Sequence, residues 1–130
     1  MIYLDTSALL KLVFHEGESE TLAAWLGARA DLPKVSSQLC RVESIRACRR
    51  IDVAAVPTVE RLLSGLDLMP ITGDVIERAA RVGQPAVRSL DAIHLASAMK
   101  LRSDLSAFVA YDRRLRDAAK AADLDVVAPT

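Results

Sequence analysis

The chain has 130 residues, of which 52% are hydrophobic and 26% are charged. This length suits one domain, and the apolar share is typical of a globular chain and not of a disordered one. Lys and Arg together number 17, and Asp and Glu together also number 17, so the formal net charge is zero. A net charge of zero argues against a polybasic protein that binds nucleic acid through bulk positive charge. Residues 1–130 are therefore interpreted as a single domain.

The sequence carries no sign of a leader, a membrane span or a zinc site. It opens Met-Ile-Tyr-Leu-Asp, which lacks the basic and apolar regions of a signal peptide, and no apolar run approaches the roughly 20 residues of a membrane helix. Cys40 and Cys48 lie in one expected helix, about 12 Å apart and too far for a disulfide. With His15 and His94 as the only histidines, no metal-binding spacing occurs. We expect a cytoplasmic protein with buried, reduced thiols and no membrane partner.

Hydrophobic periodicity predicts short strands that alternate with helices. In chain order, the expected elements are a strand at 2–4, helices at 7–14 and 18–30, a strand at 34–36, helices at 37–50 and 56–66, a strand at 68–71, a helix from the Thr72 cap through Val82, a helix at 89–101, a strand at 107–111, a helix at 113–122 and a last strand at 126–127. Such alternation implies a parallel sheet covered on both faces. The fold class is α/β, a three-layer α/β/α sandwich with a short-stranded central sheet.

Acidic residues follow two of the expected strands. Asp5 comes at the carboxyl end of the first strand, and Asp112 at the carboxyl end of the strand at 107–111. Ligands of open α/β sheets gather at this edge, so neighbouring strands would bring the two carboxylates together. Each residue also has a purely structural interpretation, because Asp is a favoured N-cap for the helix that follows a strand.

Two further acids lie in expected helices. Asp91 opens a helix that is apolar nearly all round, where it either stabilises the helix dipole or needs a partner such as a cation. Glu43 lies in an arginine-rich helix, and its spacing alone favours an exposed ion pair with Arg46 or Arg50. Acids crowded at one sheet edge would repel one another unless a cation neutralised them, and Mg²⁺ prefers oxygen ligands. Such an ion activates water for attack on a phosphodiester.

Four segments together resemble the PIN domain and, more narrowly, the single-domain VapC toxins of prokaryotic type II toxin–antitoxin systems. The segments are Leu4-Asp5-Thr6-Ser7-Ala8-Leu9, the helix that contains Glu43, Arg88-Ser89-Leu90-Asp91-Ala92-Ile93-His94-Leu95-Ala96, and Tyr111-Asp112-Arg113-Arg114-Leu115. The resemblance covers the whole chain, and the Leu-Asp-Ala-Ile-His-Leu-Ala run is its most specific part. It implies a PIN domain over residues 1–130.

The resemblance implies a Mg²⁺- or Mn²⁺-dependent endoribonuclease, the toxin of a toxin–antitoxin pair, that hydrolyses RNA with metal-activated water. It implies two partners besides RNA, a cognate antitoxin that holds the enzyme inactive and a second copy of the chain in a homodimer. By position, the catalytic acids that form the metal pocket are Asp5, Glu43, Asp91 and Asp112. Asp5, Asp91 and Asp112 would bind the ion directly or through water, and Glu43 would hold a second metal or a water.

Several neighbours of these acids have secondary roles by the same resemblance. Thr6 and Ser7 would orient Asp5 and contact substrate. The family often has Ser or Thr two residues before the last acid, but this chain has Ala110 there, which removes one possible hydrogen bond near the metal. Arg113 and Arg114, directly after Asp112, are candidates for binding RNA phosphates.

Other signals favour structural interpretations. His94 is expected to pack beside the buried helix, Trp25 to lie in the core or in a partner groove, and most of the remaining arginines to lie on solvated helix faces. A haloacid-dehalogenase-like phosphatase would need an acid where Ser7 stands, and a phospho-receiver would need an amino-terminal acidic pair. The alternative function that stays open is a catalytically weak PIN scaffold that mainly binds its antitoxin or another protein.

Overall fold

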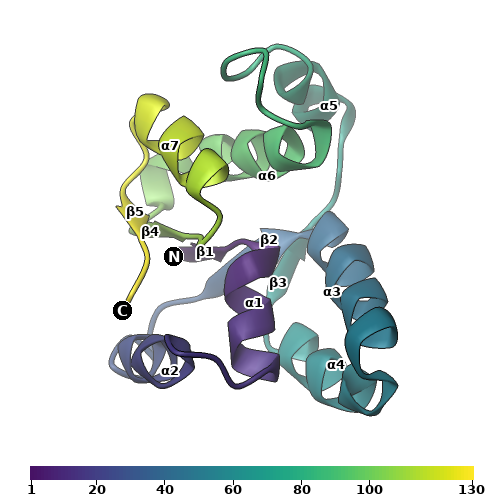
Figure 1. The fold of residues 1–130 in the computed structure, drawn as a ribbon. Coiled ribbons are helices and arrows are strands. Elements are labelled where there is room, and N and C mark those ends of the chain that lie inside the picture. Colours follow the sequence, from purple (N-terminus) through teal and green to yellow (C-terminus); the bar gives the residue numbers. More distant parts are fainter.

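The computed structural model describes residues 1–130 and contains one five-stranded sheet (Figure 1). Every neighbouring pair of strands is parallel, and the strand order is β3-β2-β1-β4-β5. The parallel sheet expected from the alternation of strands and helices is therefore confirmed. The strands are β1 (Ile2–Leu4), β2 (Lys34–Ser37), β3 (Asp67–Met69), β4 (Ala107–Val109) and β5 (Val126–Val127).

Helices cover both faces of the sheet, which confirms the three-layer α/β/α architecture. The first four helices lie on one face and the last three on the other (Figure 1). None of them has the length and hydropathy to span a bilayer. The helices are α1 (Thr6–Val13), α2 (Ser19–Gly27), α3 (Gln38–Ile51), α4 (Val56–Ser64), α5 (Gly73–Ala79), α6 (Ser89–Lys100) and α7 (Arg113–Ala121), with short 3₁₀ turns η1 (Val53–Ala55) and η2 (Arg102–Asp104).

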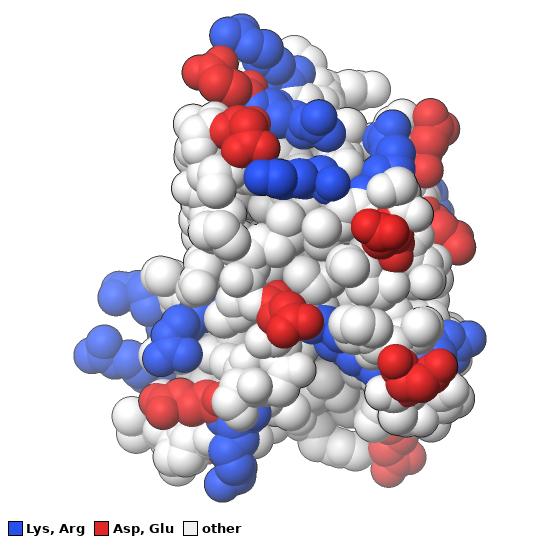
Figure 2. Space-filling view, turned by 180° about the vertical axis from the view of Figure 1, so that it is seen from behind, with Lys and Arg blue, Asp and Glu red and all other residues white.

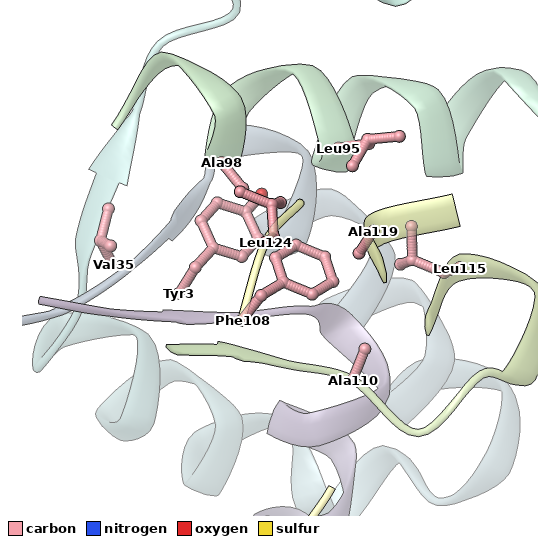
Figure 3. Packing of buried hydrophobic residues seen from close by; sticks show 9 residues of the cluster. All are labelled: Tyr3, Val35, Leu95, Ala98, Phe108, Ala110, Leu115, Ala119 and Leu124. Carbon is pink, nitrogen blue, oxygen red and sulfur yellow. The ribbon is translucent and has the colours of Figure 1, made fainter. Parts of the chain in front are cut away.

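Side chains of the central strands alternate between the two faces, as the period of a strand requires. Tyr3 of β1 and Phe108 of β4 point into the layer beneath α6 and α7, where their rings stack 5.3 Å apart beside Leu95 (Figure 3). Ile2, Leu4 and Val109 instead belong to the cluster with Leu22 of α2. Because the central strands are covered on both sides, both faces are apolar.

The two cysteines lie in a third cluster formed by α1, α3 and α4. Both are free and buried, which confirms the interpretation of the thiols from their spacing. Burial is the main cause that raises the pKa of the Cys40 thiol, to about 11. Cys40 is therefore protonated near neutral pH and does not act as a thiolate ligand or nucleophile.

Several elements end earlier than the hydrophobic pattern predicts. The strand expected to reach residue 111 ends at Val109, because the Tyr111 amide donates to the Ser7 hydroxyl 2.9 Å away and not to a neighbouring strand. Helix α2 ends at Gly27 and not at residue 30, and α4 ends at Ser64, with Gly65 as its C-cap, and not at residue 66. Helix α5 stops at Ala79, short of Val82, and the chain then turns at Gly83, which has a φ of 75°. A positive φ is accessible to glycine at little cost.

We expect Phe108→Ala to destabilise the protein by about 3–5 kcal/mol, because it opens a cavity in the largest buried cluster. Urea unfolding monitored by circular dichroism measures the change. Ile51→Ala is the matched control, because Ile51 is 60% exposed and its truncation should cost less than about 1 kcal/mol. Similar losses in both variants would contradict the assignment of the core.

Candidate active site

Asp5 lies where β1 passes into α1 and is 4% exposed. Its backbone amide continues the sheet by donating to the Val109 carbonyl at 3.0 Å. Its Oδ2 atom accepts from the amide and the hydroxyl of Ser7, at 3.2 and 2.7 Å. The N-cap interpretation of Asp5 is therefore confirmed. The cap uses only one carboxylate oxygen, and Oδ1 lies 3.5 Å from His94 Nε2.

Ser7 links the start of α1 to the segment that follows β4. Its hydroxyl donates to Asp5 and accepts from the Tyr111 amide, so the chain just before Asp112 is fixed beside Asp5. Asp112 caps α7 by accepting the Leu115 amide on Oδ1 at 3.1 Å. Its other oxygen, Oδ2, is left free of the helix. Both strand-end aspartates thus cap a helix with one oxygen and keep the other for a different partner.

Asp91 lies in the first turn of α6, with its side chain 18% exposed. The Arg88 guanidinium provides its partner, with Nε 3.2 Å from Asp91 Oδ2. Burial raises the pKa of Asp91, the hydrogen bond and charge of Arg88 oppose this, and the charges of Asp112 and Asp5 raise it further. The net pKa is above the ordinary value. Asp91 is thus close enough to both other aspartates to experience their charge.

Glu43 projects from α3 toward α1 and α6. Its Oε1 atom accepts from the Thr6 hydroxyl and hydrogen-bonds with His94 Nε2, both at 2.7 Å. Burial raises the pKa of Glu43, but the hydrogen bond and charge of His94 lower it, and the net pKa is below the ordinary value. The ion pair with Arg46 or Arg50, which the spacing alone favours, is absent, so that interpretation is wrong. The partners of Glu43 come from other helices.

His94 is buried at the centre of this arrangement, which confirms that it packs in the interior. Its Nδ1 atom lies 2.7 Å from the Tyr3 hydroxyl and its Nε2 atom faces Glu43, so both ring nitrogens are engaged. Burial lowers the pKa of His94, but the hydrogen bond with Glu43 and the charges of Asp5, Glu43 and Asp91 raise it. The net pKa is above the ordinary value.

The four acids therefore form two adjoining pairs in this conformation. Asp5 and Glu43 face His94, and Asp91 and Asp112 face Arg88. No three Asp, Glu, His or Cys side chains converge closely enough to hold a metal ion. The donors are nevertheless carboxylate and hydroxyl oxygens, the ligand type that Mg²⁺ and Mn²⁺ prefer. The site fits such an ion in donor chemistry, provided that the carboxylates turn away from His94 and Arg88.

The four residues predicted to contact substrate fall into two groups, one bonded to the acids and one exposed to solvent. Thr6 and Ser7 contact the acids, whereas Arg113 and Arg114 are exposed at the start of α7 and form no ion pair. On the face seen in Figure 2, Lys and Arg lie in separate groups interspersed with Asp and Glu, without a continuous basic surface. Trp25 packs against the cluster around Leu22, as expected, and the Arg29 guanidinium lies 4.0 Å from its ring centroid.

Sequence reasoning missed two contributors, Arg88 and Tyr3. Arg88 lies three residues before Asp91 at the N-cap of α6, a spacing that allows an ion pair, but nothing local indicates its contact with Asp112. The sequence predicts Tyr3 only as a residue of the first strand. Its contact with His94 depends on how α6 packs on the sheet, which local sequence does not indicate. Ala110 is fully buried in the core, so it supplies no hydroxyl to the site.

The sheet has the strand order β3-β2-β1-β4-β5, and an acid follows each of the neighbouring strands β1 and β4. The chain is therefore an α/β domain with its site at the carboxyl ends of parallel strands. The family model described as "PIN domain" matches residues 2–121, and the chain belongs to the PIN domain family. Ribonuclease VapC35 of Mycobacterium tuberculosis is 47% identical over 131 residues, which cover 99% of this chain and 97% of that protein. The family expected from the sequence motifs is therefore confirmed.

Solved structures support the same fold. The crystal structure of VapC20 of Mycobacterium tuberculosis, described as a sarcin-ricin loop cleaving toxin, matches with a TM-score of 0.74 and 22% identity. The match covers 99% of this chain and all of that one. A toxin–antitoxin complex from Klebsiella pneumoniae matches with a TM-score of 0.69 and 20% identity over 100% of this chain and 98% of that one.

We expect His94→Gln to destabilise the metal-free protein more at about pH 5.5 than at about pH 9. A raised pKa means that the folded protein holds this proton more tightly than the unfolded chain does. The stabilisation is complete below the unfolded value of about 6.5 and is lost as the pH rises through the folded value. Urea unfolding in EDTA at both pH values measures the difference.

The control is His15→Gln, because His15 is exposed and contacts none of the acids. Its effect on stability should be small at both pH values. An equal loss for His94→Gln at the two pH values would show that His94 stabilises the fold by packing alone.

Proposed function

We propose that this chain is a Mg²⁺- or Mn²⁺-dependent endoribonuclease that acts as the toxin of a type II toxin–antitoxin pair. One observation carries the proposal: Asp5, Glu43, Asp91 and Asp112, which come from four separate elements, gather at the carboxyl ends of β1 and β4. Strand order reverses between these strands, and ligands of open α/β sheets bind at such a point. A relative that matches nearly the whole chain is named a ribonuclease.

Each acid has a role in this proposal. Asp5, Asp91 and Asp112 would hold the ion, directly or through water, and Glu43 would hold a second metal or a water. A bound Mg²⁺ or Mn²⁺ would supply a water activated for attack and would neutralise charge on the phosphodiester. Ser7 holds one oxygen of Asp5, which fixes the direction of the other. Thr6 fixes Glu43 in the same way.

The substrate in this proposal is RNA, and its phosphates would approach the exposed face of the acidic site. Arg113 and Arg114 directly follow Asp112, are exposed, and have donors that are not committed to ion pairs. Guanidinium groups in that position suit contacts with the phosphates that flank the bond to be cleaved. The structural neighbour described as cleaving the sarcin-ricin loop supports an RNA substrate as a class.

The proposal includes an antitoxin partner, which the Klebsiella pneumoniae complex of similar fold supports. Two exposed apolar side chains, Val42 and Leu90, directly precede the acids Glu43 and Asp91. We expect an antitoxin bound to these side chains to lie next to the site, because each of them adjoins one of the four acids along its helix. A homodimer and a cytoplasmic location complete the proposal, because an RNA-cleaving toxin meets its substrates in that compartment.

We expect Asp5→Asn to reduce cleavage of total RNA by about 100-fold or more in the presence of Mg²⁺ or Mn²⁺, because the amide removes a negative ligand from the ion. The substitution keeps the shape of the side chain and an oxygen that can still cap α1. Cleavage is followed by gel electrophoresis of RNA incubated with purified protein, with and without EDTA.

Asp31→Asn is the matched control, because Asp31 is exposed and lies outside the site, in the turns after α2. It should cleave as the wild type does. Equal cleavage by wild type and Asp5→Asn would identify the activity as a contaminant. A folded wild type that cleaves no RNA with either metal would favour the alternative of a PIN scaffold that only binds its partner.

A further inference from the structure

Arg88 bridges two of the four acids. Its Nε atom lies 3.2 Å from Asp91 Oδ2, and its Nη2 atom lies 3.2 Å from Asp112 Oδ2. The two acids come from different elements, since Asp91 is in the first turn of α6 and Asp112 caps α7. The bridge therefore joins α6 to the segment after β4 through one positive charge. No other Lys or Arg pairs with any of the four acids.

The oxygens that Arg88 occupies are those that the fold leaves free. Asp112 uses Oδ1 to cap α7 and turns Oδ2 to the guanidinium. Asp91 accepts no hydrogen bond apart from the one that Arg88 donates. A divalent ion held by both aspartates would need Asp112 Oδ2, the oxygen that the Arg88 guanidinium occupies. The guanidinium and the ion therefore compete for one position between the two carboxylates.

The contacts of Arg88 allow it to be displaced. Its side chain is 62% exposed, and it gives each carboxylate a single hydrogen bond and not the paired fork typical of strong Arg–carboxylate contacts. Exposed ion pairs of this kind contribute little to stability. Arg88 also precedes the first residue of α6, so movement of its side chain breaks no helical contact. An ion with two positive charges attracts both carboxylates more strongly than the guanidinium does.

We propose that Arg88 is an internal counter-ion of the acidic site, which holds Asp91 and Asp112 together in the metal-free protein and which a divalent metal must displace on binding. The inference rests on the metal site in the proposed function and adds a residue that sets its affinity. In this role Arg88 lowers the apparent affinity for metal, and it keeps two like charges from separating while the site contains no ion.

The test is isothermal titration of metal-free protein with Mn²⁺, comparing wild type with Arg88→Gln. Removal of the competing cation should tighten Mn²⁺ binding by about two- to thirtyfold, the factor that corresponds to two weak ion pairs. Arg88→Lys keeps the charge but cannot span both carboxylates with a planar fork, so its affinity should fall between those of wild type and Arg88→Gln.

Arg113→Gln is the electrostatic control. It removes the same charge one residue from Asp112, but Arg113 forms no ion pair with the acids. Its effect on Mn²⁺ affinity should be clearly smaller than that of Arg88→Gln. A gain for Arg113→Gln as large as that for Arg88→Gln would overturn the proposal, because the net charge of the region alone would then set the affinity.

Thermal unfolding gives a second measurement that does not depend on activity. In EDTA, Arg88→Gln should melt below the wild type, and Mn²⁺ should raise its Tm by more than it raises that of the wild type. Unchanged or weaker Mn²⁺ binding by Arg88→Gln, while the wild type binds the ion, would overturn this inference and leave the metal site in place. Failure of the folded wild type to bind Mn²⁺ would instead contradict the proposed function itself.

Discussion

The structure depends on one constraint: β1 and β4 are parallel neighbours, and an aspartate follows each of them. Asp5 and Asp112 are consequently fixed near the same edge of the sheet, and α6 brings Asp91 close enough for its charge to interact with both. The Ser7 hydroxyl fixes this geometry by bonding to Asp5 and to the Tyr111 amide. Carboxylates held this close repel one another, so the protein must supply positive charge at the same place.

A guanidinium at the N-cap of α6 and an imidazole within α6 face these acids. His94 faces Asp5 and Glu43 from the buried side, and Arg88 spans Asp91 and Asp112 from the exposed side. Part of the balance that gives a net charge of zero therefore lies within the site, where opposite charges contact one another. A sum over the chain says nothing about such local balance. It argues against a polybasic binder, but it leaves open an enzyme that contacts phosphate through metal and a few arginines.

Most of the fold was predictable, because it depends on local sequence patterns. Strands Ile2–Leu4 and Ala107–Val109 are short apolar runs, and the helices between strands carry apolar stripes, so the alternation alone predicts a parallel sheet. The positions of Asp5 and Asp112 were predictable in the same way, because each residue comes shortly after a strand that the pattern predicts. Helix and strand ends were less predictable where a tertiary contact decides them, as at Tyr111, whose amide bonds to a hydroxyl from the start of the chain.

The site was only partly predictable, because its key contacts join residues far apart in the sequence. Spacing alone pairs Glu43 with arginines of its own helix, whereas its actual partner His94 is 51 residues away. The motif resemblance, which reflects whole-chain geometry, placed Glu43 with the other acids where spacing did not. Neither approach indicated that Arg88 reaches Asp112, since that contact depends on how the α6 and α7 ends meet.

The most direct measurement of the central claim, that the four acids form one metal centre, is an anomalous difference map from crystals soaked with Mn²⁺. We expect a peak within about 2.5 Å of carboxylate oxygens of at least two of Asp5, Asp91 and Asp112, with the Arg88 guanidinium withdrawn from between Asp91 and Asp112. A fully soaked crystal with no peak at these carboxylates, or with its strongest peak elsewhere on the protein, would contradict the claim.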